Sequence, residues 1–171
     1  IKTNHALLQQ VRHDNPDAYL LYKPHPDVVD KARGSSAINA QLYDLEVDNI
    51  SIIDLINAVD ETHTMTSLTG FEALLRGKKV VTYGMPFYAG WGLTIDNLTC
   101  ERRTRQLTIE QLVAGCLILY PTYVTPNGDI CDVETAISLL AEQKKHKPSR
   151  GQRALTSTLF LLRKIGLLKA S

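Results

Sequence analysis

The segment from residue 64 to residue 94 constrains the fold more than any other part of the chain. It opens with hydroxyl residues, continues into a helix-forming run over residues 71–75, and reaches Gly77, a residue type that commonly ends helices. The β-rich residues 80–83 follow at once and favour a short buried strand. Together with a strand expected over residues 61–65, this order predicts parallel pairing, in which ligands bind beyond the carboxyl ends of the strands.

Ser67, Thr69 and Gly70 stand at the predicted start of this helix. Unpaired backbone N–H groups at a helix start donate hydrogen bonds to the oxygen of a capping hydroxyl, and together with the helix dipole they also attract anions. The pattern therefore leaves two interpretations open: a plain N-cap, or a site for an anion such as phosphate. Glu72, in the first turn, is either a solvated carboxylate or a ligand-binding one.

Alternation of helices and strands before this segment predicts an α/β fold with a parallel sheet flanked by helices. The expected elements are a helix over 4–15 capped by Asn4, a buried strand over 18–22, a short strand within 42–47, and a helix over 52–59 capped by Ser51. Neither a GxGxxG fingerprint nor a P-loop is present, so a bound anion would be held by other means.

Lys23 and His25 follow the strand expected over 18–22. Pro24 and Pro26 hold the backbone extended on either side of His25, at the strand end where open α/β sheets bind ligands. A cation and an imidazole there could bind phosphate. The alternative is a surface loop with a structural histidine.

Residues 84–107 form a long connection that is rich in glycine and aromatic residues. Loops of this length are usually functional or disordered, and the aromatic content argues against disorder. Tyr88 and Trp91, with Phe87, would either stack on a sugar or base, or cover the sheet. Arg102 and Arg103 could pair with a carboxylate or phosphate, or remain solvated surface charges.

The remaining chain predicts a helix over 109–119 with a capping box at Thr108 and Gln111, a turn over 126–129, and a helix over 133–142 capped by Asp132. Residues 1–142 are treated as one domain, 143–153 as a basic linker and 154–171 as a basic and apolar helix. All 18 acidic residues lie within 1–142 beside 11 basic ones, whereas residues 143–171 carry eight basic residues and no acid. The last helix would bind an anionic membrane surface, dock on another domain, or oligomerise.

Composition excludes several classes of protein. A hydrophobic fraction of 44% and a charged fraction of 22% are ordinary for a globular domain, and no apolar run approaches the length that spans a bilayer. The three cysteines lack CxxC spacing, which indicates neither a disulfide framework nor a zinc site. The helical pattern starts immediately at Ile1, so we expect a piece of a longer protein from a reducing cytoplasm.

Several motifs in order resemble the capsule polysaccharide β-Kdo transferase family (KpsC/LipB). They are KPHPDV from Lys23, the long segment TSLTGFEALLRGKKVVTYGMPFYAGWGLT from Thr66, RR before LT, and YPTYV from Tyr120. The resemblance implies one Rossmann-like, nucleotide-binding half of a GT-B-like glycosyltransferase. It implies transfer of Kdo, an ulosonic acid, from CMP-β-Kdo to a phosphatidylglycerol-linked acceptor, without a metal or other cofactor.

The resemblance also implies roles for individual residues. His25 would contact the donor phosphate with Ser67, Thr69, Gly70 and Lys23. Glu72 would bind the ribose, and Tyr88, Trp91, Arg102 and Arg103 are candidates for sugar or acceptor contacts. The catalytic carboxylate is expected in an N-terminal half of the same enzyme, so this chain alone would bind donor without turnover.

The resemblance further implies a cytoplasmic enzyme, peripheral at the inner membrane of a Gram-negative bacterium, that associates with a capsule assembly complex and not with nucleic acid. Two alternatives remain at this point. One is a CMP-sugar transferase of the sialyltransferase kind, because the residues do not separate Kdo from other ulosonic acids. The other is a non-catalytic module that binds a nucleotide or a partner protein.

Overall fold

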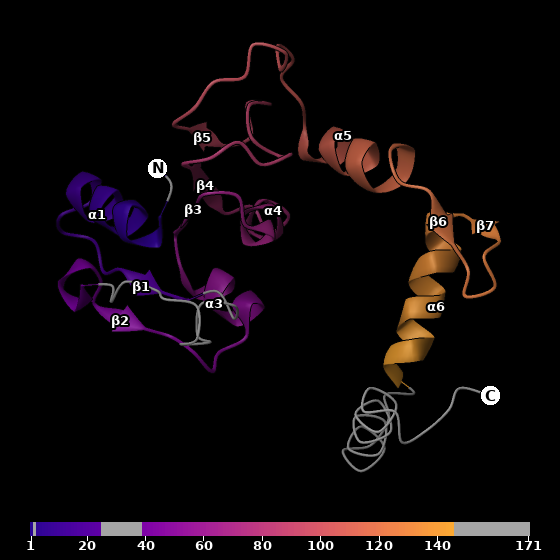
Figure 1. Ribbon diagram of the computed structural model, residues 1–171, viewed down its shortest axis with the longest axis horizontal. Coiled ribbons are helices and arrows are strands. Elements are labelled where there is room, and N and C mark those ends of the chain that lie inside the picture. The colour runs from indigo at the N-terminus through magenta and orange to yellow at the C-terminus, as the bar shows by residue number, and fades with distance from the viewer. Residues whose placement is uncertain (2, 25–38, 146–171) are drawn as a thin grey trace, which may run out of the picture. The chain divides into compact units, whose positions relative to one another are not determined.

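The computed structural model describes residues 1, 3–24 and 39–145 (Figure 1). His25 and the helix expected over 154–171 lie outside these residues. The chain divides into two compact units, an N-terminal unit of residues 1–113 and a C-terminal unit that begins at Ala114. This division falls inside the span that the sequence analysis treats as one domain, and each unit is described by itself.

Parallel strands build the N-terminal unit, which confirms the expected α/β fold. One sheet has the order β3 (Glu61–Thr64), β4 (Lys79–Thr82) and β5 (Ile95–Asp96), and both of its strand pairs are parallel. A second parallel pair joins β1 (Leu21–Tyr22) to β2 (Leu45–Glu46). The strand β5 lies within the connection expected to be irregular, so that expectation was wrong at residues 95–96.

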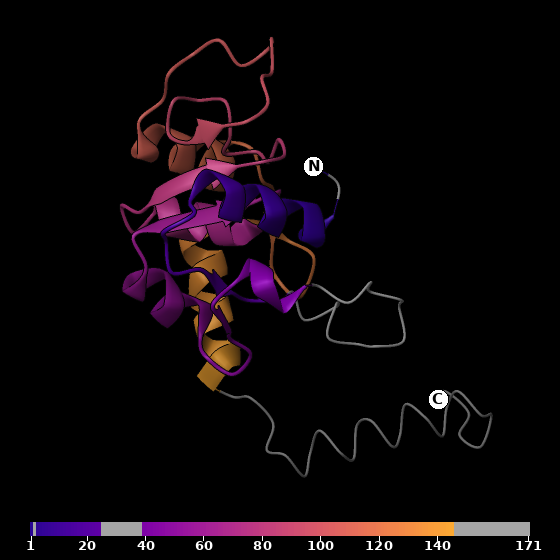
Figure 2. The same ribbon diagram turned by 90° about the vertical axis from the view of Figure 1, so that its left-hand side faces the viewer.

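This unit also contains helices α1 (Asn4–Asp14), α3 (Ile52–Ala58) and α4 (Leu68–Leu74), a 3₁₀ turn over Ala40–Leu42, and α5 (Ile109–Val113) at its end. Side chains alternate between the two faces of a strand. Val81 and Tyr83 pack with Val11 of α1, which crosses the sheet in Figure 2. Contacts of α4 with both β3 and β4 bring its buried residues onto the sheet.

Side chains explain why β1 is shorter than expected. The predicted strand over 18–22 includes Tyr19, whose exposed fraction is 70%, and only its last two residues pair. The Ala18 carbonyl accepts a hydrogen bond from Arg12, and the Leu20 N–H donates to the Asp44 carboxylate at 2.7 Å. These side chains occupy backbone groups that a longer strand would need for its ladder.

Most of the helix N-caps predicted from the sequence are confirmed. Ser51 caps α3, and Thr108 and Gln111 exchange both capping-box hydrogen bonds ahead of α5 (Ile109–Val113). The cap of α1 was assigned to the wrong residue, because the hydroxyl of Thr3, not Asn4, accepts from the Ala6 N–H.

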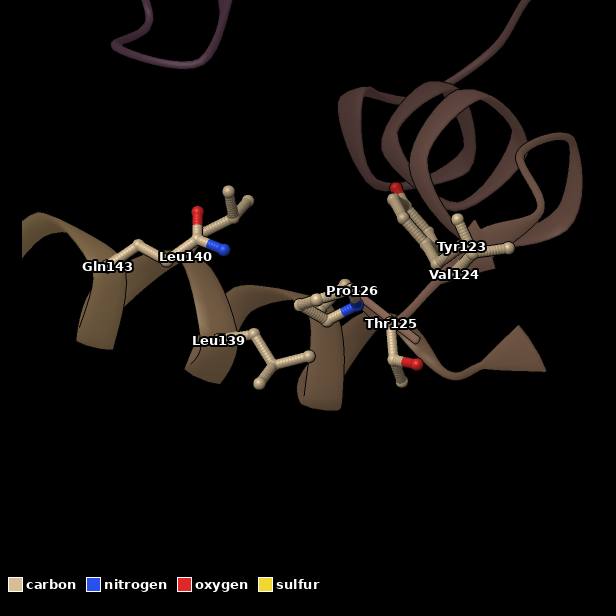
Figure 3. A pocket seen from close by; sticks show the side chains of 8 residues that line it. Tyr123, Val124, Thr125, Pro126, Leu139, Leu140 and Gln143 are labelled. Atoms are coloured by element: carbon tan, nitrogen blue, oxygen red, sulfur yellow. The ribbon is translucent and has the colours of Figure 1, made fainter. Parts of the chain in front are cut away.

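The C-terminal unit contains a π-helical turn (Ala114–Leu119), an antiparallel hairpin of β6 (Tyr123–Val124) and β7 (Ile130–Cys131), and α6 (Val133–Lys145). Asp132 caps α6 as expected. The helix runs three residues past its expected end, and Lys144 and Lys145 suit the negative end of the helix dipole. An apolar groove of about 310 Å³ lies between the hairpin and α6. Figure 3 shows the side chains that line it, which include Tyr123, Pro126 and Leu140.

Candidate functional site

The candidate site begins at the carboxyl ends of β3 and β4. Their last residues, Thr64 and Thr82, lie opposite each other in the parallel register and are both buried. The Thr64 hydroxyl accepts a hydrogen bond from the Ser67 N–H at 3.2 Å. This contact fixes the turn that leads from β3 into α4.

Ser67 is the N-cap of α4, which confirms the capping interpretation of the sequence. Its hydroxyl oxygen accepts from the Thr69 N–H at 3.2 Å and lies 3.0 Å from the Thr69 hydroxyl oxygen. Ser67 is exposed and Thr69 is half-buried, so two adjacent hydroxyl groups stand at the carboxyl edge of the sheet. Capping does not exclude ligand binding, and the phosphate role of both residues stays a prediction.

Gly70 has a packing role in the structure. Its N–H donates to the Ser67 carbonyl at 3.2 Å, and it lies against Tyr88 so closely that an added Cβ would be 2.7 Å from Tyr88 Cζ. A side chain at this position would overlap the aromatic ring. The sequence therefore needs glycine here for the approach of Tyr88, whether or not the backbone also meets a phosphate.

Glu72 carries an unsatisfied acceptor. Its carboxylate oxygen Oε2 is buried and has no hydrogen-bond partner among the described residues. Its backbone carbonyl, by contrast, accepts from Arg76 at 2.7 Å. Because a buried acceptor without a donor is costly, the oxygen suits a hydroxyl donor such as a ribose hydroxyl.

The aromatic residues of the long connection differ in exposure: Tyr88 is buried, Trp91 is half-buried and Phe87 is exposed. Tyr88 has no exposed surface, and burial raises its pKa to about 12. Its hydroxyl donates to the Ser67 carbonyl at 2.5 Å. Its ring packs on Phe71 and Phe87, so Tyr88 belongs to the core in this structure, as the covering interpretation expects.

Trp91 and Arg103 form a second group in the same connection. The Trp91 indole N–H donates to the Phe87 carbonyl at 2.8 Å, and the Arg103 guanidinium carbon lies 5.4 Å from the centre of the Trp91 ring. Arg103 also donates to the carbonyls of Pro86 and Ala89, both at 2.6 Å. Its guanidinium thus binds the backbone of the connection, whereas Arg102 is exposed.

Lys23, a candidate phosphate ligand, binds backbone carbonyls in the structure. Its ammonium nitrogen lies 3.0 Å from the carbonyl oxygens of Asp48 and Ile50 and 3.4 Å from that of Val47. Lys78 makes a similar contact at the other end of α3, at 3.0 Å from the Asn57 oxygen and 2.8 Å from the Val59 oxygen. One lysine therefore holds the segment before α3, and another holds its end.

Asp96 is a residue of this region that the sequence analysis missed. One carboxylate oxygen accepts from the hydroxyls of Thr82 at 2.7 Å and Thr94 at 2.6 Å, and the other accepts from the Gly90 N–H at 2.8 Å. Asp96 thereby joins the end of β4 to the glycine-rich connection. The signal available was weak: one acidic residue after Ile95 in a segment expected to lack a strand.

His63 lies in β3 and is half-buried. Its Nδ1 atom lies 3.2 Å from the Tyr83 hydroxyl, and its Nε2 atom lies 3.4 Å from a Glu61 oxygen. Burial lowers the pKa of His63, although the nearby Glu61 carboxylate acts in the opposite direction. Glu61 itself pairs with Lys79 at 2.5 Å, and that contact lowers the carboxyl pKa.

Metal-binding clusters and membrane-spanning helices are both absent from the part of the chain that the structure describes. No cluster of three or more histidine, cysteine or acidic residues there could hold a metal ion. No helix there has both the length and the apolar character needed to cross a bilayer.

Comparison with known proteins defines the class. Residues 1–125 match the family described as capsule polysaccharide biosynthesis protein, and the chain belongs to this family. This confirms the resemblance inferred from the motifs at Lys23, Thr66 and Tyr120.

Two solved structures are similar to this chain in both sequence and fold. The chain is 46% identical to Thermosulfurimonas dismutans KpsC, beta Kdo 2,7 transferase, with a TM-score of 0.75 over 84% of this chain and 47% of that one. A second structure, the beta Kdo 2,4 transferase of the same KpsC, gives 35% identity and a TM-score of 0.65 over 78% of this chain and 43% of that one.

Among curated relatives, the capsule polysaccharide modification protein LipA of Neisseria meningitidis serogroup A is 53% identical over 148 residues. That match covers 84% of this chain and 21% of LipA, so the chain spans about a fifth of that relative. The lipopolysaccharide-processing protein LpsZ of Rhizobium meliloti is 37% identical over 92% of this chain and 37% of its own length.

Proposed function

We propose that this chain is the donor-binding half of a capsule glycosyltransferase, which transfers Kdo from CMP-β-Kdo to a phosphatidylglycerol-linked acceptor. The observation that carries the proposal is the 46% identity and TM-score of 0.75 to slightly less than half of a solved β-Kdo transferase chain. The match extends over 84% of this chain.

The chemistry of the leaving group fits the carboxyl edge of the sheet. CMP departs as the glycosidic bond breaks, so the site must stabilise negative charge growing on its phosphate. Hydroxyl groups of Ser67 and Thr69 stand at this edge, and His25 follows the end of β1 in the sequence. These groups can donate hydrogen bonds to the phosphate without a metal ion.

Glu72 supplies the second element of the proposed donor site. Its buried Oε2 atom lacks a partner among the described residues, and a ribose hydroxyl would provide the missing donor. A hydrogen bond from a ribose hydroxyl to this oxygen would strengthen nucleotide binding, because the oxygen is already desolvated and gives up no bond to water when the ribose binds. Glu72 lies three residues beyond Thr69 on α4, about one helical turn, and this position is compatible with contacts to one nucleotide.

The remaining parts of the reaction would lie outside this chain. The catalytic carboxylate and the acceptor site are assigned to an N-terminal half of the same enzyme, so the chain alone binds donor without turnover. A lipid-linked acceptor would place the enzyme at the cytoplasmic face of the inner membrane, beside a capsule assembly complex. The eight basic residues after Glu142 suit an anionic lipid surface.

Calorimetric titration with CMP, with UMP and AMP as controls, tests the donor site. Ser67→Ala should weaken CMP binding about tenfold, equivalent to about 1.4 kcal/mol. Ser51→Ala is a matched control, because Ser51 also caps a seven-residue helix and accepts from the N–H two residues on, at 3.3 Å. Both variants lose about 1 kcal/mol of cap stabilisation, but only Ser67→Ala should change affinity.

The titration also separates the alternative functions. Equal affinity for CMP, UMP and AMP, or equal effects of the two serine variants, would contradict a cytidine-specific site at Ser67. If the chain binds CMP selectively, the sugar donor can be tested with the enzyme that has both halves. Transfer from CMP-sialic acid but not from CMP-Kdo would favour a transferase of the sialyltransferase kind. A folded chain with both halves present that binds no nucleotide would favour the non-catalytic module.

A further inference from the structure

We propose that Tyr88 is a positioning residue that holds the Ser67 turn in the shape that binds the donor phosphate. This inference rests on the proposed function, because it concerns the same site. Its basis is the hydrogen bond from the Tyr88 hydroxyl to the Ser67 carbonyl, 2.5 Å long and made across 21 residues of chain. The bond links the aromatic connection directly to the residue that presents the hydroxyl.

The Tyr88 ring has little freedom to move away from this bond. It packs on Phe71 with ring centres 6.3 Å apart and on Phe87 edge to face at 5.2 Å. On another side lies Gly70, whose missing side chain leaves the space for the Tyr88 hydroxyl and ring. Because the side chain has no exposed surface, its hydroxyl is fixed by packing before any ligand binds.

The backbone that carries Tyr88 is also fixed by hydrogen bonds. Arg103 donates to the carbonyls on both sides of it, at Pro86 and Ala89. Asp96 accepts from the Gly90 N–H and is itself bound to Thr82 at the end of β4. The connection is therefore bound to the sheet through Asp96, and it places the Tyr88 hydroxyl against the N-cap residue of α4.

The Ser67 peptide receives support from two directions. Its N–H donates to the Thr64 hydroxyl at the end of β3, and its carbonyl accepts from Tyr88. With both ends of the residue held, contact with the Thr69 hydroxyl and N–H sets the direction of the Ser67 hydroxyl. Binding groups held by such supporting contacts lose less entropy when the ligand arrives.

Tyr88→Phe tests the inference, with Tyr83→Phe as the matched control. Tyr83 is also buried, and its hydroxyl lies 3.2 Å from His63 instead of contacting Ser67. Tyr88→Phe should weaken CMP binding roughly three- to tenfold, the size expected from losing one hydrogen bond. Tyr83→Phe should leave CMP affinity unchanged. Equal affinities in the two variants would overturn the positioning role.

Amide hydrogen exchange gives a readout that needs no ligand. The Thr69 and Gly70 N–H groups donate to Ser67 atoms, so they should exchange several-fold faster in Tyr88→Phe than in Tyr83→Phe. If the unsubstituted chain does not bind CMP, the donor proposal fails while exchange still tests whether Tyr88 holds the turn. Exchange at these two amides that is no faster in Tyr88→Phe than in Tyr83→Phe would refute the inference by itself.

Discussion

Replacing Gly70 by alanine should destabilise the N-terminal unit by about 1–3 kcal/mol, although alanine is the better helix former. The added Cβ would lie 2.7 Å from Tyr88 Cζ and 2.9 Å from Cε2, well inside the 3.5–4.0 Å of favourable carbon contacts. Tyr88 is fully buried and cannot swing into solvent. Overpacking of this kind costs about 1–3 kcal/mol, and displacing the Tyr88 hydroxyl adds about 1 kcal/mol. The better helix propensity of alanine offsets up to about 1 kcal/mol of this loss in the free energy of unfolding.

Urea unfolding followed by Trp91 fluorescence and by circular dichroism would measure this change. Trp91 is the single tryptophan of the chain and reports on the N-terminal unit. Gly115→Ala provides the opposite case, because nothing lies within 4 Å of the Cβ added in that helical turn. It should stabilise its own unit by roughly 0.5–1 kcal/mol. A Gly70→Ala variant as stable as the unsubstituted chain would refute the packing argument.

Three other perturbations test separate parts of the molecule. His25→Ala should weaken CMP binding by roughly 1–3 kcal/mol, whereas alanine at the exposed His13 should not; equal titration curves would remove His25 from the site. Because burial lowers the folded-state pKa of His63, the unfolded chain binds the proton more readily, and stability should fall as pH decreases through 6.5 toward 5. The urea midpoint of His63→Gln should change less over this pH range than that of the unsubstituted chain. The same dependence of the midpoint on pH in both proteins would exclude His63 as the cause. Removal of residues 146–171 should reduce sedimentation with vesicles that contain phosphatidylglycerol, most clearly at low salt; undiminished binding would argue against a membrane role for this segment.

Sequence reasoning located the parts of the fold that local signals determine. The caps at Ser51, Ser67 and Asp132 were predicted because a hydroxyl or carboxylate binds an N–H two or three residues on. Parallel pairing of β3 and β4 followed from the helix between them. These features depend on short stretches of chain, which a single sequence displays directly.

Features set by distant contacts were not predictable in the same way. The strand β5 has two residues, and its pairing depends on Asp96 meeting Thr82 across 14 positions. The sequence could not choose between stacking and covering for Tyr88, because the choice depends on the space left by Gly70. Lys23 is predicted from the sequence as a cation beside a phosphate, and the sequence gives no sign of its carbonyl partners, which come from a loop about 25 residues away.

The two lysines at the ends of α3 have a consequence for chemical reactivity. Amine-directed reagents need an accessible nitrogen, and the side-chain nitrogens of Lys23 and Lys78 each bind two or three backbone carbonyl oxygens. Labelling followed by mass spectrometry should therefore modify the exposed Lys144 well before either of them. Acylation at Lys23 or Lys78, once it occurs, would remove the charge and release one end of the helix. Both positions would then report opening of α3 under conditions in which the rest of the unit stays folded.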